Sequence, residues 1–519
     1  MSDTTTRSSP ASRLEQYIQT AEVQSDLEGS SVRSGFIKIS AQVVQFVVGG
    51  GSAVALARLL TPADFGLLAM ASSLIAFVGS FRDFGLPMAT VHQETIDHEQ
   101  ISALFWLNQK LNVLVTLFIV LMAPVLAWFY GEPRLTLVTA VMAIAIFSAG
   151  LVLQQESLLT RQMRFGVLTL INVGSLVGSV AVGIGAALLG AGYWALVLQF
   201  LTLNFSRSAA IWLACGWRPA RPEQSKAPDV TLRSILSYSR HYTGFRVIAH
   251  VGRNLDRVLV GYFAGAGILG LYENAYKWSL FPIQQVYTPL VSVAVAGLSR
   301  VQHDPAQYRS YVRKALLPIF ALTMPPLAFA FVAARPVILV LLGDQWLGAV
   351  PLFRLLCLAA FVGSTSMVTK WLYLSLGETQ RQLRWGLVST PIMIVAVVAG
   401  VRWGALGVAA GFTIATCLLT YPAVAYCLRV TPLDGRDFLA IVWRPILASC
   451  MAAAVLLLAS PALPSDTSLA ELLSKMLLFG LAYLVVWLAL PGGRAATREI
   501  LHLLTFLRGG RARAVTTSA

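Results

Sequence analysis

The chain has 519 residues, of which 56% are hydrophobic and only 12% are charged, and its formal net charge is +15. A soluble globular protein carries about twice that charged fraction, roughly 25%, so the composition excludes an ordinary soluble enzyme or binding domain. The positive charge is spread over short loops between apolar segments, which argues against a nucleic-acid partner.

Apolar segments long enough to cross a bilayer recur along almost the whole chain. In chain order they cover residues 34–57, 66–86, 104–129, 135–155, 165–189, 192–216, 236–264, 271–297, 313–334, 351–376, 385–402, 404–428, 440–461 and 470–490. This pattern predicts an all-α polytopic membrane protein with about 14 transmembrane helices. The polar tail at 1–33 lacks the apolar core of a signal peptide, so we expect a disordered cytoplasmic segment.

Basic residues cluster in alternate loops. They are Arg161, Arg164, Arg218, Arg221, Lys226, Arg233, Arg300, Arg309, Arg313, Lys314, Arg381, Arg384, Arg429, Arg436 and Arg444, followed by the basic tail at 491–519. Loops rich in Lys and Arg stay on the cytoplasmic side of a membrane. We therefore expect a multi-pass protein with both termini in the cytoplasm.

Several sequence features occur twice in the same order, which indicates an internal repeat. The segment Arg161–Gly166, RQMRFG, returns as Arg381–Gly386, RQLRWG. The matching glycines are Gly66 with Gly270, and Gly190 and Gly192 with Gly404 and Gly407. Each copy contains an even number of helices, so the two copies have the same orientation in the membrane and form a parallel repeat.

The repeat predicts two six-helix lobes, an N-lobe at 34–216 and a C-lobe at 235–428, joined by a cytoplasmic linker at 217–234. An additional helix pair at 429–490 has no counterpart in the first half. Two such lobes suggest a cleft between them and an alternating-access cycle.

The seventh apolar segment carries Arg246, His250, Arg253 and Arg257, whose spacing places them on one face of a helix. We call these four residues the cationic face. An Arg facing lipid at the bilayer centre costs about 2.5–3.5 kcal/mol, so we expect the cationic face to line a water-filled cavity. Such a cavity favours an anionic cargo, and a diphosphate matches the forked guanidinium donors. The simpler alternative is that the three arginines extend to the membrane surfaces.

Acidic residues lie close to the cationic face. Asp256 either pairs with a neighbouring guanidinium or, like His250, changes protonation during a transport cycle. Glu273 and Lys277 are four residues apart at the start of the next segment. They form either an ion pair at the membrane surface or an outer gate or ion-coupling site.

Polar residues in the first half are candidates for the same cavity. Gln42 and Gln45 lie on one face of the first segment, and alignment of the repeat sets Gln42 against Arg246. Arg207 lies within the sixth segment and is a further cavity candidate. A hydrogen bond between helices explains the two glutamines equally well.

The two RQxR motifs place Arg161, Arg164, Arg381 and Arg384 at predicted cytoplasmic loops, and we call these residues the basic collar. They either anchor the protein to anionic headgroups or guide a charged headgroup into the cleft.

The sequence contains no motif for catalysis or metal binding. The five cysteines have no metal-ligand spacing, and no phosphate-binding loop or HExxH motif occurs. No polar stretch between the apolar segments is long enough for a folded extramembrane domain. We therefore predict a protein that is not an enzyme, with no catalytic residues, no metal and no cofactor.

Short motifs in order along the chain resemble a known family. They are Leu59–Gly66 (LLTPADFG), Asp83–Pro87 (DFGLP), Asn254–Arg257 (NLDR), Gly261–Phe263 (GYF) and Leu342–Trp346 (LGDQW). Over about residues 34–428 the chain resembles Wzx-type polysaccharide transporters of the multidrug/oligosaccharidyl-lipid/polysaccharide exporter superfamily.

The resemblance implies a flippase of the bacterial inner membrane. Its expected cargo is an undecaprenyl-diphosphate-linked oligosaccharide, moved to the periplasmic leaflet for exopolysaccharide, capsule or O-antigen assembly. It also implies an H⁺ or Na⁺ gradient as driving force. The expected partners are this lipid-linked cargo, membrane lipids and polysaccharide polymerase or export machinery; we expect no nucleic acid and a monomer.

Two other functions stay open. A drug/cation antiporter of the same superfamily is expected to carry acidic residues in the cleft, where this chain is basic. A non-transporting scaffold of a polysaccharide synthesis complex would not need the cationic face.

Overall fold

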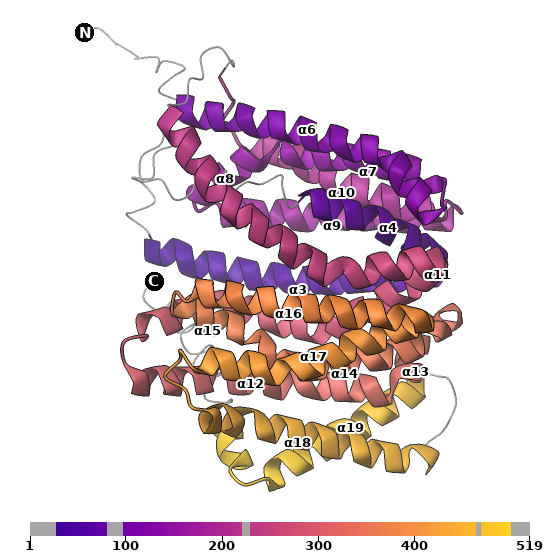
Figure 1. Cartoon of the computed structure of the whole chain (residues 1–519), viewed down its shortest axis with the longest axis vertical. Coiled ribbons are helices and arrows are strands. Elements are labelled where there is room, and N and C mark those ends of the chain that lie inside the picture. The colour runs from indigo at the N-terminus through magenta and orange to yellow at the C-terminus, as the bar shows by residue number, and fades with distance from the viewer. Residues whose placement is uncertain (1–26, 80–96, 221–228, 463–468, 500–519) are drawn as a thin grey trace, which may run out of the picture. The chain divides into compact units, whose positions relative to one another are not determined.

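The computed structural model describes residues 27–79, 97–220, 229–462 and 469–499, and these parts are built from helices (Figure 1). In the two helices that cover 27–59 and 229–300, side chains are described from Ala41 and from Asn254 onward, except at 288–293 and 296. No strand occurs among the described residues. The predicted all-α class is confirmed.

The chain divides into two compact units, Met1–Gly270 and Leu271–Ala519. The helices of the first unit are α3 (Leu27–Leu59), α4 (Pro62–Gly79), α6 (His98–Tyr130), α7 (Arg134–Gly150), α8 (Leu153–Arg161), α9 (Phe165–Leu188), α10 (Tyr193–Ala214) and the first part of α11 (Asp229–Arg300). Within α11 the backbone leaves helical geometry at Gly265, where φ is 78° and ψ is 178°. This break separates the predicted seventh and eighth segments.

The second unit contains the remainder of α11 and the helices that follow it. These are α12 (Pro305–Val332), α13 (Ala334–Leu341), η2 (Asp344–Ala349), α14 (Val350–Met367), α15 (Thr369–Ser375), α16 (Thr379–Gly400), η3 (Val401–Trp403), α17 (Gly404–Leu428), α18 (Gly435–Ala459), η4 (Ser460–Ala462) and α19 (Leu469–Ala489). The boundary between the two compact units thus falls after Gly270 in the chain. The lobe boundaries that the repeat predicts stay a prediction.

The turn between α3 and α4 is formed by the motif Leu59–Gly66, and hydrogen bonds explain its Thr and Asp. The Thr61 hydroxyl and backbone N–H both donate to Asp64 Oδ2, at 2.7 and 2.9 Å. Pro62 occupies the first helical position, where its missing N–H costs nothing. Thr before the helix and a carboxylate in its first turn together satisfy donors that a helix start leaves open.

The two halves share one backbone feature that an internal repeat predicts. Gly192 precedes α10 with φ 55° and ψ −135°, and Gly404 begins α17 with φ 65° and ψ −154°. Only glycine adopts this region of φ/ψ space readily. The two halves therefore share a rare local conformation at equivalent places.

Twelve helical stretches in the described part of the chain are long and apolar enough to cross a membrane. Four of them are composite. Arg134–Arg161 contains α7 and α8, Asp344–Ser375 contains η2, α14 and α15, Thr379–Leu428 contains α16 and α17, and Asn254–Tyr287 contains the break at Gly265. The multi-pass membrane class is thus confirmed, and the count of fourteen helices stays a prediction.

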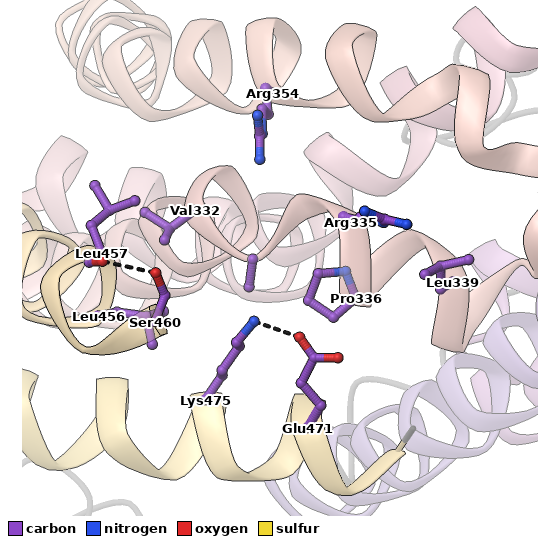
Figure 2. A pocket seen from close by; sticks show the side chains of 11 residues that line it. Val332, Arg335, Pro336, Leu339, Arg354, Leu456, Leu457, Ser460, Glu471 and Lys475 are labelled. Atoms are coloured by element: carbon purple, nitrogen blue, oxygen red, sulfur yellow. Dashed lines mark hydrogen bonds and ion pairs between the residues drawn. The ribbon is translucent and has the colours of Figure 1, made fainter. Parts of the chain in front are cut away.

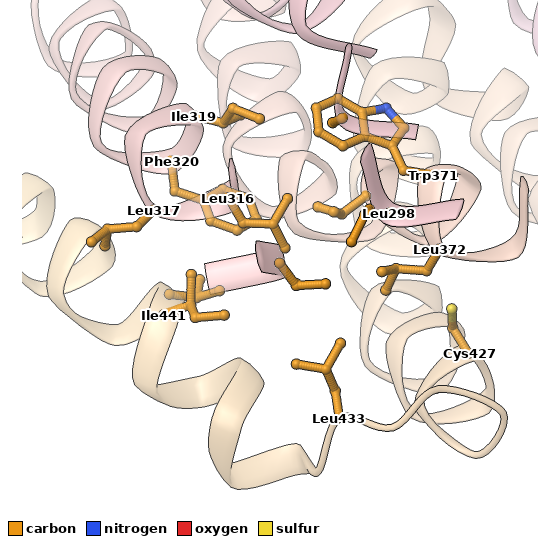
Figure 3. Close-up of a cluster of buried hydrophobic side chains, with 14 of the residues drawn as sticks. Leu298, Leu316, Leu317, Ile319, Phe320, Trp371, Leu372, Cys427, Leu433 and Ile441 are labelled. Atoms are coloured by element: carbon orange, nitrogen blue, oxygen red, sulfur yellow. The ribbon is translucent and has the colours of Figure 1, made fainter. Parts of the chain in front are cut away.

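The additional helix pair α18–α19 is packed into the second unit. Phe320 of α12, Trp371 of α15 and Ile441 of α18 belong to one buried cluster, each at most 2% exposed (Figure 3). Tyr483 Oη of α19 donates to the carbonyl oxygen of Ala321 in α12 at 3.1 Å. Such close packing and interhelical hydrogen bonding hold helices together in lipid, where water exclusion contributes little. The pair is therefore an integral part of the unit's core.

Candidate functional site

The cationic face lies on an unbroken stretch of helix. α11 runs without a break from Asp229 to Gly265, so the four residues keep the helical register that the sequence predicts. The side chains of Arg246, His250 and Arg253 lie outside the described residues. Arg257 is half-buried, and its Nη1 donates to Asn254 Oδ1 at 3.0 Å.

Asp256 lies deeper than its neighbours on the same helix. This residue is only 3% exposed, whereas Arg257 and Asn254 are half-buried. A carboxylate buried to this degree in a membrane helix requires charged or hydrogen-bonding neighbours to remain ionised. Further along α11, in the second unit, Glu273 is half-buried and Lys277 is exposed. Ion pairing, gating and ion coupling for these residues stay predictions.

The polar face predicted for the first helix is turned away from the exposed side of α3. Gln42 and Gln45 are half-buried, while Val43, Val44 and Val47 are exposed. Apolar residues on the exposed side are those expected to contact lipid. This arrangement is consistent with a polar interior for the two amides, and their role as cavity residues stays a prediction.

Arg207 is held in a network of three residues on three helices. Its Nη2 lies 2.5 Å from Glu156 Oε1 of α8, and its Nε donates to Asn172 Oδ1 of α9 at 2.9 Å. The side chains of Arg207 and Glu156 are 27% and 32% exposed. Because Glu156 balances the guanidinium charge, Arg207 contributes less to a cationic cavity than its sequence position suggests.

Glu156 and Asn172 are polar residues that the sequence reasoning missed. The signal available was the run Gln154–Glu156 at the end of an apolar segment, which places a carboxylate where a lipid-facing helix would not keep one. The partner on α9 could not be chosen from sequence, because the pairing depends on how three helices pack.

The break between α7 and α8 is stabilised by side chains from a neighbouring helix. A helix break leaves backbone carbonyls without intrahelical donors, and in a membrane each must find another partner. Asn108 Nδ2 and Gln109 Nε2 of α6 donate to the carbonyl oxygen of Gly150 at 3.3 and 3.2 Å. Asn112 Nδ2 adds a hydrogen bond of 2.9 Å to the carbonyl oxygen of Phe147, which also accepts from the Leu151 N–H at 3.2 Å. The amides of α6 therefore give the first unit a polar interior at this break.

An apolar cavity of about 280 Å³ lies on the side of α11 next to the cationic face. It is lined by Ser73, Leu74 and Phe77 of α4, Leu126, Phe129 and Tyr130 of α6, and Asn254, Leu255 and Val258 of α11. Asn254 thus both lines this cavity and accepts the hydrogen bond from Arg257. The Asn254 side chain therefore links the Arg257 guanidinium to the wall of the apolar cavity.

The residues of the basic collar occupy different places in the two copies. Arg161 is the last residue of α8 and Arg164 directly precedes α9, whereas Arg381 and Arg384 lie in the first turns of α16. In each copy the first arginine is half-buried and the second is exposed. Arg381 Nε lies 3.4 Å from Glu378 Oε2, which reduces its charge toward other anions. A role in headgroup binding stays a prediction for all four.

Among the described residues, no group of three or more His, Cys, Asp and Glu side chains is placed to hold a metal ion. Cys215, Cys357 and Cys427 are buried, and burial raises the pKa of the Cys215 thiol, just beyond the end of α10, above its usual range. A thiol that stays protonated is a poor nucleophile and a poor ligand. These three cysteines therefore pack the core, while Cys450 is exposed.

These observations define a class of protein, a multi-pass membrane protein with a repeated helical core and charged residues inside it. The same fold occurs in a solved structure described as "Lipid II flippase MurJ, inward closed conformation". The TM-score is 0.66 at 12% sequence identity, with 88% of this chain and 98% of that chain covered.

A family model described as "Polysaccharide biosynthesis protein" matches residues 55–351, more than half of the chain. The chain belongs to this family. It is 22% identical to the lipopolysaccharide biosynthesis protein WzxC of Escherichia coli (strain K12), over 79% of this chain and 84% of that protein. It is 26% identical to the succinoglycan biosynthesis transport protein ExoT of Rhizobium meliloti (strain 1021), over 77% of this chain and 80% of that protein.

Proposed function

We propose that this chain is a flippase for oligosaccharides linked to undecaprenyl diphosphate. It moves them from the cytoplasmic to the periplasmic leaflet of the bacterial inner membrane, with both of its termini in the cytoplasm. Membership of the polysaccharide biosynthesis family supports the pathway. Similarity to ExoT, a succinoglycan biosynthesis transport protein, and the fold shared with a lipid II flippase support transport of a lipid-linked sugar.

The observation that carries the proposal is the cationic face on the unbroken first part of α11. Three arginines on one helix face repel one another and are costly to desolvate. A diphosphate neutralises that repulsion and accepts paired hydrogen bonds from guanidinium groups. The cationic face thus favours cargo with a doubly charged linkage over neutral lipids.

The apolar cavity beside Asn254 fits the other end of the cargo. Most of its lining is aromatic or aliphatic, including Phe77, Phe129 and Val258, which suits a hydrocarbon better than a sugar. An isoprenoid segment next to the diphosphate has the matching chemistry. The rest of the polyprenyl chain stays in the bilayer, so the protein moves only the polar head across the membrane.

The transport cycle follows from these contacts. Binding of the diphosphate removes the repulsion within the cationic face and favours closure of the cytoplasmic side; opening to the periplasm admits water and weakens the grip. Gln42 and Gln45 supply neutral hydrogen-bonding partners for sugar hydroxyls. Protonation or ion binding at Asp256, His250 or Glu273 resets the cycle, with Lys277 as a gate partner.

This scheme makes and breaks no covalent bond, so it requires neither catalytic residues nor a cofactor. The protein acts as a monomer, and polymerase or export machinery receives the product.

The test compares two variants of the cationic face with a charge-matched control. We expect Arg253→Ala and Arg257→Ala each to lose at least tenfold in export, measured as surface polysaccharide in a strain that depends on this protein. Arg402→Ala removes an equal charge from the exposed turn η3 and should leave export unchanged. Membrane levels of all variants are compared by immunoblot. Full export by both variants at normal levels would overturn the proposal.

A further inference from the structure

A charged cavity lies within the second unit. It has a volume of about 360 Å³, within the range of about 300–1,000 Å³ typical of small-molecule sites. Figure 2 shows the residues that line it, from α12, α13, α14, α18 and α19. No residue of α11 is among them. The proposed transport site therefore makes no use of this cavity.

The charges in this cavity leave an excess of two cations. Lys475 Nζ lies 2.5 Å from Glu471 Oε1, and these side chains are 15% and 9% exposed, so the pair largely cancels its own charge. Arg335 and Arg354 also line the cavity, and neither has a carboxylate partner within the part of the chain that the structure describes. Figure 2 shows Arg354 directed into the cavity from α14 and Lys475 from the opposite side.

The remaining wall is aliphatic and continues onto an exposed apolar surface. Val332, Leu339 and Leu456 line the cavity together with Leu457. Leu457 and its neighbour Leu458 are 54% and 83% exposed, in a helix long and apolar enough to cross a membrane. A ligand can therefore place a charged group in the cavity that the two arginines line, while its hydrocarbon part remains against the outside of α18.

We propose that this cavity binds the phosphodiester of an anionic membrane lipid. Two unpaired guanidinium groups match phosphate oxygens through paired, charge-assisted hydrogen bonds. The lipid would connect α14 and α13 to the ends of α18 and α19, because these helices contribute the cations and the walls. It thereby holds the additional helix pair against the rest of the second unit. This proposal is independent of the transported cargo.

The test measures lipid binding by native mass spectrometry on the full-length chain purified in detergent. Titration with dioleoyl phosphatidylglycerol should give one adduct that Arg335→Gln/Arg354→Gln binds at least tenfold more weakly. The matched control is Arg402→Gln, an exposed arginine outside the cavity, and it should keep wild-type affinity. Equal affinity of the double variant and the wild type would overturn the proposal.

Thermal unfolding in the same detergent gives an independent readout. Phosphatidylglycerol should raise the Tm of the wild type and not that of the double variant. Glu471→Gln releases Lys475 as a third cation, so its Tm should rise more than that of the wild type on lipid addition. If phosphatidylcholine or soluble glycerol 3-phosphate stabilised the wild type as much as phosphatidylglycerol, the site would not be one for an anionic lipid.

Discussion

Gly66 faces the backbone carbonyl of Ala266, four residues before Gly270, and Gly270 faces the backbone carbonyl of Pro62, four residues before Gly66. A Cβ placed on Gly66 would lie 1.7 Å from the carbonyl oxygen of Ala266, and a Cβ on Gly270 would lie 1.8 Å from that of Pro62. The two contacts are reciprocal, as expected for equivalent positions of an internal repeat. Glycine at both places lets the start of α4 and the segment after the Gly265 break approach backbone to backbone.

We expect Gly66→Ala and Gly270→Ala to destabilise the protein strongly. Overpacking usually costs about 1–3 kcal/mol, and here the obstacle is backbone, which cannot rotate away as a side chain can. Detergent thermal unfolding monitored by tryptophan fluorescence measures the change. Gly174→Ala in α9 is the control, since nothing lies within 4 Å of its added Cβ. An unchanged Tm for both glycine variants would contradict this close contact.

The Arg207–Glu156 pair predicts a measurable coupling energy. Removing one partner of a buried ion pair costs about 3–5 kcal/mol of stability, whereas an exposed ion pair contributes only about 0–1 kcal/mol. Because this pair is about one-third exposed, the loss of either partner should cost an amount between these ranges. Arg207→Gln and Glu156→Gln should each destabilise, while the double variant should be more stable than the sum of the two losses implies.

A double-mutant cycle on unfolding free energies measures that coupling. The comparison pair is Arg134 with Glu132, at 3.0 Å, whose arginine is 48% exposed. Its coupling should be the smaller of the two. Coupling near zero for Arg207 with Glu156 would remove the charge balance assigned to them.

The helix break after Gly150 predicts a specific rescue. A Cβ at this position would lie 2.2–2.3 Å from the amide atoms of Asn112, so Gly150→Ala should lower the Tm. Because the obstacle is a side chain, adding Asn112→Ala should recover part of the loss. Asn112→Ala alone should be mild, since a single hydrogen bond between membrane helices averages about 0.6 kcal/mol. A double variant less stable than Gly150→Ala would show that Asn112 is not the obstacle.

The sequence was sufficient for features that depend on residue type and spacing along one chain segment. Hydrophobic length predicted the membrane helices, and the repeated glycines predicted equivalent places in the two halves. The register of Arg246 to Arg257 needed only an unbroken helix, which α11 provides. These properties are local, so they can be inferred before any packing is known.

Features that depend on packing could not be inferred in the same way. The apolar segment at 135–155 gave no sign that α7 ends at Gly150, because the compensating donors come from α6, far away in sequence. Arg207 was found as a charge within a membrane helix, but its partner Glu156 belongs to a short helix that the pattern did not predict. The cavity between α13 and α19 likewise exists only once the helices are assembled.

The central claim is that the cationic face recognises the diphosphate of a lipid-linked sugar. The most direct measurement is translocation in proteoliposomes of a fluorescent undecaprenyl-diphosphate oligosaccharide, beside a neutral analogue without the diphosphate. We expect the protein to transport the charged lipid and not the neutral analogue. An ion gradient should stimulate this transport, and Arg253→Ala should abolish it. Equal transport of both lipids by the wild type would contradict the central claim.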